Sequence, residues 1–163
     1  MSTAKEQMDI VCKALDDYEK SSGMPELKAP GSETEMQKYF TMSRDELEAL
    51  SSRDCAEISF RLAQFSFYIQ RLCNRETSRA NWATTTLNES VAQELNQFSQ
   101  YTKFDIKVSL IAKENEYVKK LQSIIKYANQ RMDRLSFLSN NIKYLSEVMT
   151  ANQRAKILER NNV

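Results

Sequence analysis

The chain has 163 residues, of which 41% are hydrophobic and 28% are charged, and its formal net charge is +1. This length fits one domain with an additional arm, and this balance excludes a disordered chain and favours a soluble globular or coiled-coil protein. Because the chain has no histidine, the commonest general base and metal ligand are missing, which favours a binding or assembly protein over an enzyme and predicts no metal and no cofactor.

Both glycines and both prolines lie within residues 21–33, and residues 35–163 contain neither type. Glycine and proline are the main breakers of regular structure. A long run without them that is rich in Leu, Glu, Lys, Arg, Gln and Asn is typical of long helices. The predicted fold class is therefore all-α.

The N-terminal segment predicts one amphipathic helix. Ser2 or Thr3 can cap a helix that runs to about residue 20. Its apolar residues recur at steps of three and four, which gives one stripe along the helix. Residues 21–34 then form a linker, since their Pro and Gly steps favour extended or turn geometry. The apolar stripe of the helix before this linker consists of Met8, Val11, Leu15 and Tyr18.

Two short helices are expected within residues 35–52. Ser32 with Glu35 and Ser43 with Glu46 each have the spacing of a capping box. The first box predicts a helix through Phe40, and the second predicts a helix that begins at about residue 44. The serines at positions 51 and 52 are expected to end this region before the main body begins.

The main body, residues 53–163, predicts two long helices that form an antiparallel, coiled-coil-like hairpin. Apolar residues alternate at three- and four-residue steps in both halves, which is the spacing of a heptad seam. The reversal is expected at residues 98–104, where Thr102 with Asp105 can cap the second helix. A single continuous rod is the alternative, since the turn has no Gly or Pro. The two seams are Ile58, Leu62, Phe65, Ile69, Leu72, Ala83, Leu87, Val91, Leu95 and Phe98, and Val118, Leu121, Ile125, Ala128, Met132, Leu135, Leu138, Ile142, Leu145 and Met149.

Both long helices carry a second apolar stripe at the end far from the turn. Two helices alone cannot bury two faces each. The N-terminal helices, a second copy of the chain, or both must cover these stripes, and self-association is the favoured interpretation. The expected interface residues are Phe60, Phe67, Phe137 and Tyr144, flanked by Ala56, Ala63 and Val148.

Charge is distributed unevenly, because residues 1–55 carry 7 basic and 12 acidic residues, whereas residues 101–163 carry 12 and 6. An acidic arm on a basic body suits an anionic partner, although an ordinary solvated surface is the alternative. Basic residues interleaved with aromatic ones are typical of single-stranded nucleic-acid binding, since cations follow phosphates and rings stack on bases. Packing against a neighbouring helix is the other interpretation of the aromatics. The candidates are Arg71, Arg75, Arg79 and Trp82 on the first long helix, and Lys113, Tyr117, Lys120, Tyr127, Arg131 and Arg134 on the second.

Other functional signals are weak. The acidic clusters lack a partnering His or Cys, and no phosphate-binding loop or hydrolase motif occurs. The three cysteines, Cys12, Cys55 and Cys73, lack CxxC spacing and are expected to be reduced thiols in a cytoplasmic protein. No stretch is apolar enough to cross a membrane, and no secretory signal is expected.

The aromatic-rich helix start AEISFRLAQFSFYI at residues 56–69 and the segment NQRMDRLSFLSNNI at residues 129–142 resemble small helical phage proteins of the UvsY-like recombination-mediator group. The resemblance covers about residues 50–149. It implies a helical, oligomeric protein that loads a recombinase onto single-stranded DNA coated with single-strand-binding protein, in the cytoplasm of an infected cell. The chain lacks that group's Tyr-Tyr-Ser-Gly-Arg-Gly segment and has an additional N-terminal arm. A purely structural assembly, adaptor or inhibitor protein is the alternative function.

Overall fold

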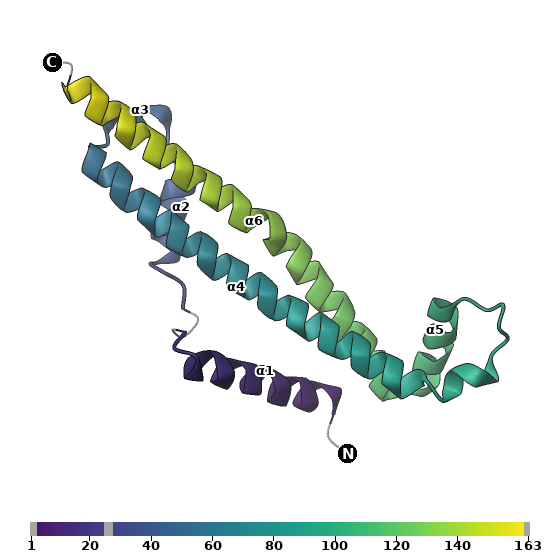
Figure 1. Cartoon of the computed structure of the whole chain (residues 1–163). Coiled ribbons are helices and arrows are strands. Elements are labelled where there is room, and N and C mark those ends of the chain that lie inside the picture. The colour runs from purple at the N-terminus through teal and green to yellow at the C-terminus, as the bar shows by residue number, and fades with distance from the viewer. Residues whose placement is uncertain (1–2, 25–27, 162–163) are drawn as a thin grey trace. The chain divides into compact units, whose positions relative to one another are not determined.

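The computed structural model describes residues 3–24 and 28–161, and within them it contains six α-helices, one short 3-10 helix and no strand. The prediction of an all-α fold is confirmed. Figure 1 shows the two long helices, α4 and α6, running side by side. The elements in chain order are α1 (Ala4–Ser21), α2 (Glu33–Phe40), α3 (Arg44–Ala49), α4 (Ser52–Val91), η1 (Glu94–Gln97), α5 (Phe104–Glu114) and α6 (Glu116–Asn161).

The helix starts follow the predicted capping residues. Thr3 accepts a hydrogen bond from the backbone N–H of Glu6, whose carboxylate accepts one from the N–H of Thr3. The same reciprocal pair joins Ser43 and Glu46 at the start of α3. Ser32 caps α2, and Ser51 caps α4. Ser2, the other candidate cap of α1, lies outside the described residues. The predicted starts of the N-terminal helices are therefore confirmed.

Hydrogen bonds across the seam fix the antiparallel register of α4 and α6. The Ser59 hydroxyl donates to the carbonyl of Ser146, and the Ser66 hydroxyl donates to the carbonyl of Ser139. Residue numbers rise on α4 as those of their partners fall on α6, so the helices run in opposite directions. The predicted hairpin is confirmed, and the alternative of one continuous rod is wrong.

The turn end of the hairpin differs from the expectation in three places. The first long helix ends at Val91 rather than near residue 99, and η1 follows it. Lys103, without a side-chain cap, precedes α5, so the predicted Thr102 cap is wrong. The expected second helix is interrupted at Asn115, whose side-chain oxygen accepts the backbone N–H groups of Tyr117 and Val118. Asparagine competes with helical hydrogen bonding in this way, so it ends one helix and caps the next.

The chain divides into two compact units, and each unit contains part of both long helices. The first unit comprises residues 1–26 and 73–133, and the second comprises residues 27–72 and 134–163. The expected division at residues 20, 34 and 52 concerns segments of the chain, and it stays a prediction. The first core contains Ala83, Leu87, Val91, Val118 and Leu121, and the second contains Ile58, Leu62, Ile69, Ile142 and Met149.

Helix α1 buries only the N-terminal part of its apolar stripe. Ala4 is 1% exposed, and Met8 packs partly buried against the core of the first unit. Leu15 and Tyr18, the C-terminal half of the predicted stripe, are 44% and 70% exposed. Only the N-terminal half of this apolar stripe is therefore covered by the first unit.

Candidate nucleic-acid interface

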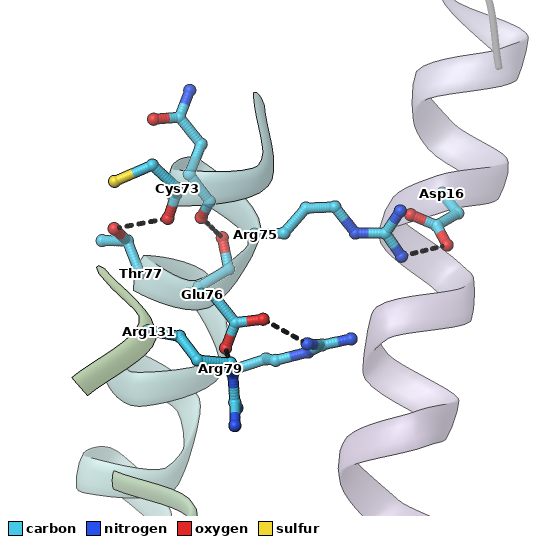
Figure 2. Close-up of polar contacts among 9 residues, drawn as sticks. Asp16, Cys73, Arg75, Glu76, Thr77, Arg79 and Arg131 are labelled. Carbon is cyan, nitrogen blue, oxygen red and sulfur yellow. Dashed lines mark hydrogen bonds and ion pairs between the residues drawn. The ribbon is translucent and has the colours of Figure 1, made fainter. Parts of the chain in front are cut away.

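A buried carboxylate, Glu76, organises the charged centre of the first unit. Glu76 lies on α4 with its side chain 9% exposed, and its Oε2 atom accepts from Nε and from a terminal nitrogen of Arg131 on α6, each at 2.8 Å. Its Oε1 atom accepts from Arg79 at 2.5 Å. Figure 2 shows the carboxylate between the two guanidinium groups. A buried charge is tolerated when it is paired and hydrogen-bonded in this way.

Helix α1 supplies the partners of two further candidate residues. The Asp16 carboxylate accepts from a terminal nitrogen of Arg75 at 2.8 Å (Figure 2). The Tyr117 hydroxyl donates to the side-chain oxygen of Gln7 at 2.5 Å. Arg75 and Tyr117 therefore face α1 and not open solvent. Arg75 on α4 and Tyr117 on α6 thus contribute to one polar surface of the first unit, which α1 contacts.

Arg79 lies between the buried carboxylate and α1. Burial lowers the pKa of Arg79, but a hydrogen bond to the Cys12 sulfur and the charge of the Glu76 carboxylate outweigh burial, so the pKa is raised above its usual value. The Nε atom of Arg79 is buried and has no hydrogen-bond partner among the described residues. The Arg79 guanidinium is thus bound to the Glu76 carboxylate, whereas its Nε–H donor is not used by any described residue.

The predicted stacking residues separate into covered and exposed ones. Trp82 and Tyr117 are partly buried against the core of the first unit, which is the packing alternative for these two rings. Tyr127 on α6 is 56% exposed. Of the three predicted aromatics, only Tyr127 is mainly exposed to solvent.

The remaining predicted cations are distributed over three helices, α4, α5 and α6, and over both units. Lys120 is exposed on α6, and Arg131 keeps half of its side chain exposed beside Glu76. Lys113 is exposed but lies on α5, so the break at Asn115 places it on another helix. Arg134, at the start of the second unit's part of α6, is exposed, and Arg71 on α4 is half-buried in that unit. The structure thus brings Lys120, Tyr127 and Arg131 together on one helix of one unit.

The expected interface residues all belong to the second unit. Phe60, Phe67, Phe137 and Tyr144 are 62–75% exposed. Phe60 is two positions from the fully buried Leu62, and Tyr144 is two positions after Ile142, which is 1% exposed. Successive helical residues are about 100° apart, so residues two positions apart lie on nearly opposite sides of a helix. Phe60 and Tyr144 therefore lie on the outer sides of α4 and α6. The helices of this unit do not cover these rings.

Sequence reasoning missed the residues of α1 that contact the basic surface. Asp16 and Gln7 were absent from the candidates because an exposed acidic or amide residue on an amphipathic helix carries no signal of its partner. Glu76 did give a signal, since a charged residue at a seam position needs a compensating group. Arg79, three residues later on the same helix, is one such group.

Comparison of the chain with protein-family models, with curated proteins and with solved structures finds no match. Among the described residues, no three side chains of the metal-ligating types gather in one place. In the same part of the chain, no helix is both long and apolar enough to span a membrane.

Proposed function

We propose that this protein is a non-enzymatic accessory factor that binds single-stranded DNA and partner proteins in phage recombination or replication. The observation that carries the proposal is the exposed group of Lys120, Tyr127 and Arg131 on α6. Steps of seven and four residues place these side chains on one side of the helix. Cations beside an open ring provide phosphate attraction together with a stacking surface.

The resemblance to the UvsY-like group supplies the biological setting of this proposal. It implies that the protein partners are a recombinase or a single-strand-binding protein. The basic excess of residues 101–163 supports an anionic ligand. Because the contacts are to phosphates and base faces, we expect binding that depends little on DNA sequence.

Fluorescence anisotropy with a labelled oligodeoxythymidine, titrated over a salt series, tests the DNA proposal. We expect Lys120→Ala to weaken binding and to flatten the slope of log affinity against log salt by about 0.7, the value for one phosphate contact on a single strand. We expect Tyr127→Ala to cost about 1–3 kcal/mol of binding free energy, as one stacked base does.

Lys126→Ala is the matched control for this series. Lys126 is also exposed on α6, but six residues after Lys120, which places it on another side of the helix. Its removal should change affinity much less than removal of Lys120. Equal losses for both lysines would mean that the helix attracts DNA only through its overall charge, and no binding by the parent at low salt would contradict the proposal.

A second function, structural assembly through self-association, is favoured by the four exposed aromatic residues of the second unit. The serine pairs fix the register, so Phe60 lies near the height of Tyr144, and Phe67 near that of Phe137. On α4, Phe60 and Phe67 are seven residues apart, and on α6, Phe137 and Tyr144 are also seven residues apart. The outer side of α4 in one copy can therefore meet the outer side of α6 in another copy with rings facing rings. Particle mass by light scattering tests this function.

A further inference from the structure

Helix α1 covers the part of the first unit where the predicted phosphate-binding arginines lie. Arg75 is paired with Asp16, and the Cys12 sulfur of α1 acts on Arg79 by raising its pKa. The helix contains three lysines against five acidic residues, which leaves a net charge of −2. An acidic helix thus occupies a surface that has the charge and hydrogen-bond donors for an anionic ligand.

Helix α1 is held on this surface by polar contacts and by a small apolar contact of Ala4 and Met8. Of its residues only Ala4 is buried, and Ile10, Leu15 and Tyr18 are 44–70% exposed. The ion pair between Asp16 and Arg75 is partly solvated, with side-chain exposures of 36% and 31%. Partly exposed ion pairs contribute little and are screened by salt. A competing polyanion can replace such contacts without loss of a large apolar interface.

The surface beneath α1 has the features of a site for a nucleic-acid backbone. Guanidinium groups suit phosphate because their donors form a planar fork. Arg79 has an unused buried donor at Nε. Tyr117 presents a hydroxyl whose present partner, Gln7, also belongs to α1. Arg75 and Tyr117 are held by α1 where a DNA ligand would meet them.

We infer that the face of the first unit beneath α1 is a second binding site for single-stranded DNA, and that α1 occupies it as an acidic substitute for the phosphate backbone. The inference rests on the proposed DNA-binding function. In the docked state the protein binds DNA only through the exposed residues of α6. When α1 leaves, Arg75 and its neighbours extend that surface onto α4.

The test measures binding of labelled oligodeoxythymidine to the full chain and to the variant Asp16→Asn over a salt series. We expect Asp16→Asn to bind several-fold more tightly and to steepen the salt slope by about 0.7, because one additional arginine reaches phosphate. Asp17→Asn is the matched control, since Asp17 is the next residue, exposed, and removes the same charge. Its effect should be smaller, with an unchanged slope.

The double variant Asp16→Asn/Arg75→Ala should return to the slope of the parent. A second readout is cleavage by a protease within residues 22–32, which connect α1 to α2. Saturating oligodeoxythymidine should accelerate this cleavage if DNA displaces α1, whereas protection would contradict displacement.

Two failures are distinguishable. If the parent binds DNA but Asp16→Asn and Asp17→Asn have the same affinity and salt slope, the inference is wrong and the proposed function stands. If neither the parent nor Asp16→Asn binds at low salt, the proposed function is wrong and the inference falls with it.

Discussion

The two units of this hairpin use the same pair of long helices but cover them differently. In the first unit α1 is held by Asp16 and Gln7, and only Ala4 is buried. In the second unit α2 inserts Met36, which is 4% exposed, and places Phe40 against Phe65 with ring centroids 6.0 Å apart. Apolar burial is the larger stabilising term. We therefore expect α1 to be the more easily displaced of the two covering helices.

The contacts between the two long helices also differ in polarity between the two units. The first unit contains the ion pairs of Glu76, whereas the second is crossed by hydroxyl contacts such as the one between Ser66 and Ser139. Four aromatic side chains of the second unit are 62–75% exposed, whereas the first unit exposes cations such as Lys120 and Arg131. The two proposed functions therefore use different regions of one antiparallel pair of helices.

The largest effect expected on stability is that of Glu76→Ala in the first unit. Removal of this carboxylate leaves Arg79 and Arg131 facing each other without their shared partner. We expect a loss of about 3 kcal/mol in the free energy of unfolding, at the low end for a broken buried ion pair, because Arg131 is half-exposed. Urea denaturation followed by circular dichroism measures this loss. Glu89→Ala, at an exposed position on the same helix, should change stability by less than about 0.5 kcal/mol.

Phe67→Glu tests whether the aromatic surface of the second unit joins copies of the chain. Phe67 is 62% exposed, so the folded chain should accept the carboxylate. In an interface that carboxylate would be buried without a partner, which is prohibitive. We expect the variant to lose its higher-order state or to precipitate. Gln64→Glu adds the same charge at a nearby exposed position on α4 and should have a smaller effect.

Light scattering with circular dichroism decides the outcome of the Phe67 experiment. An unchanged particle mass with an intact helical signal would remove Phe67 from any subunit interface. A parent protein that is monomeric at all concentrations would contradict the assembly function as a whole.

The sequence predicted those parts of the fold that depend on local pattern. The caps at Thr3, Ser32 and Ser43, most seam positions and the antiparallel pairing followed from residue spacing alone, whereas the predicted seam residue Leu138 is 38% exposed and Ser139 is buried in its place. The break at Asn115 was missed, because asparagine is tolerated within helices and only its hydrogen bonds reveal the cap.

The candidate site was less predictable than the fold, because partner choice depends on contacts between distant segments. The spacing of Arg75 and Arg79 predicted a basic stripe on one helix, yet nothing local indicates that Asp16, 59 residues away, pairs with Arg75. Lys120 and Tyr127 stayed exposed, whereas Trp82 and Tyr117 packed inward. Amphipathic aromatics suit both environments, so the pattern could not separate them.

The smallest effect on stability is expected from a substitution that changes the first unit alone, which tests whether the two units open separately. Asn115 caps α6 through its side-chain oxygen, and Asn115→Ala removes that acceptor from the N–H groups of Tyr117 and Val118. Loss of such a cap costs about 1 kcal/mol. Asn115→Asp retains an acceptor and should restore most of the stability. Hydrogen exchange should show faster opening of amides near residues 116–124 in the alanine variant, with little change at α2 and α3. Faster exchange throughout the second unit as well would mean that the hairpin unfolds as one cooperative body, and the separate behaviour expected of the two units would be wrong.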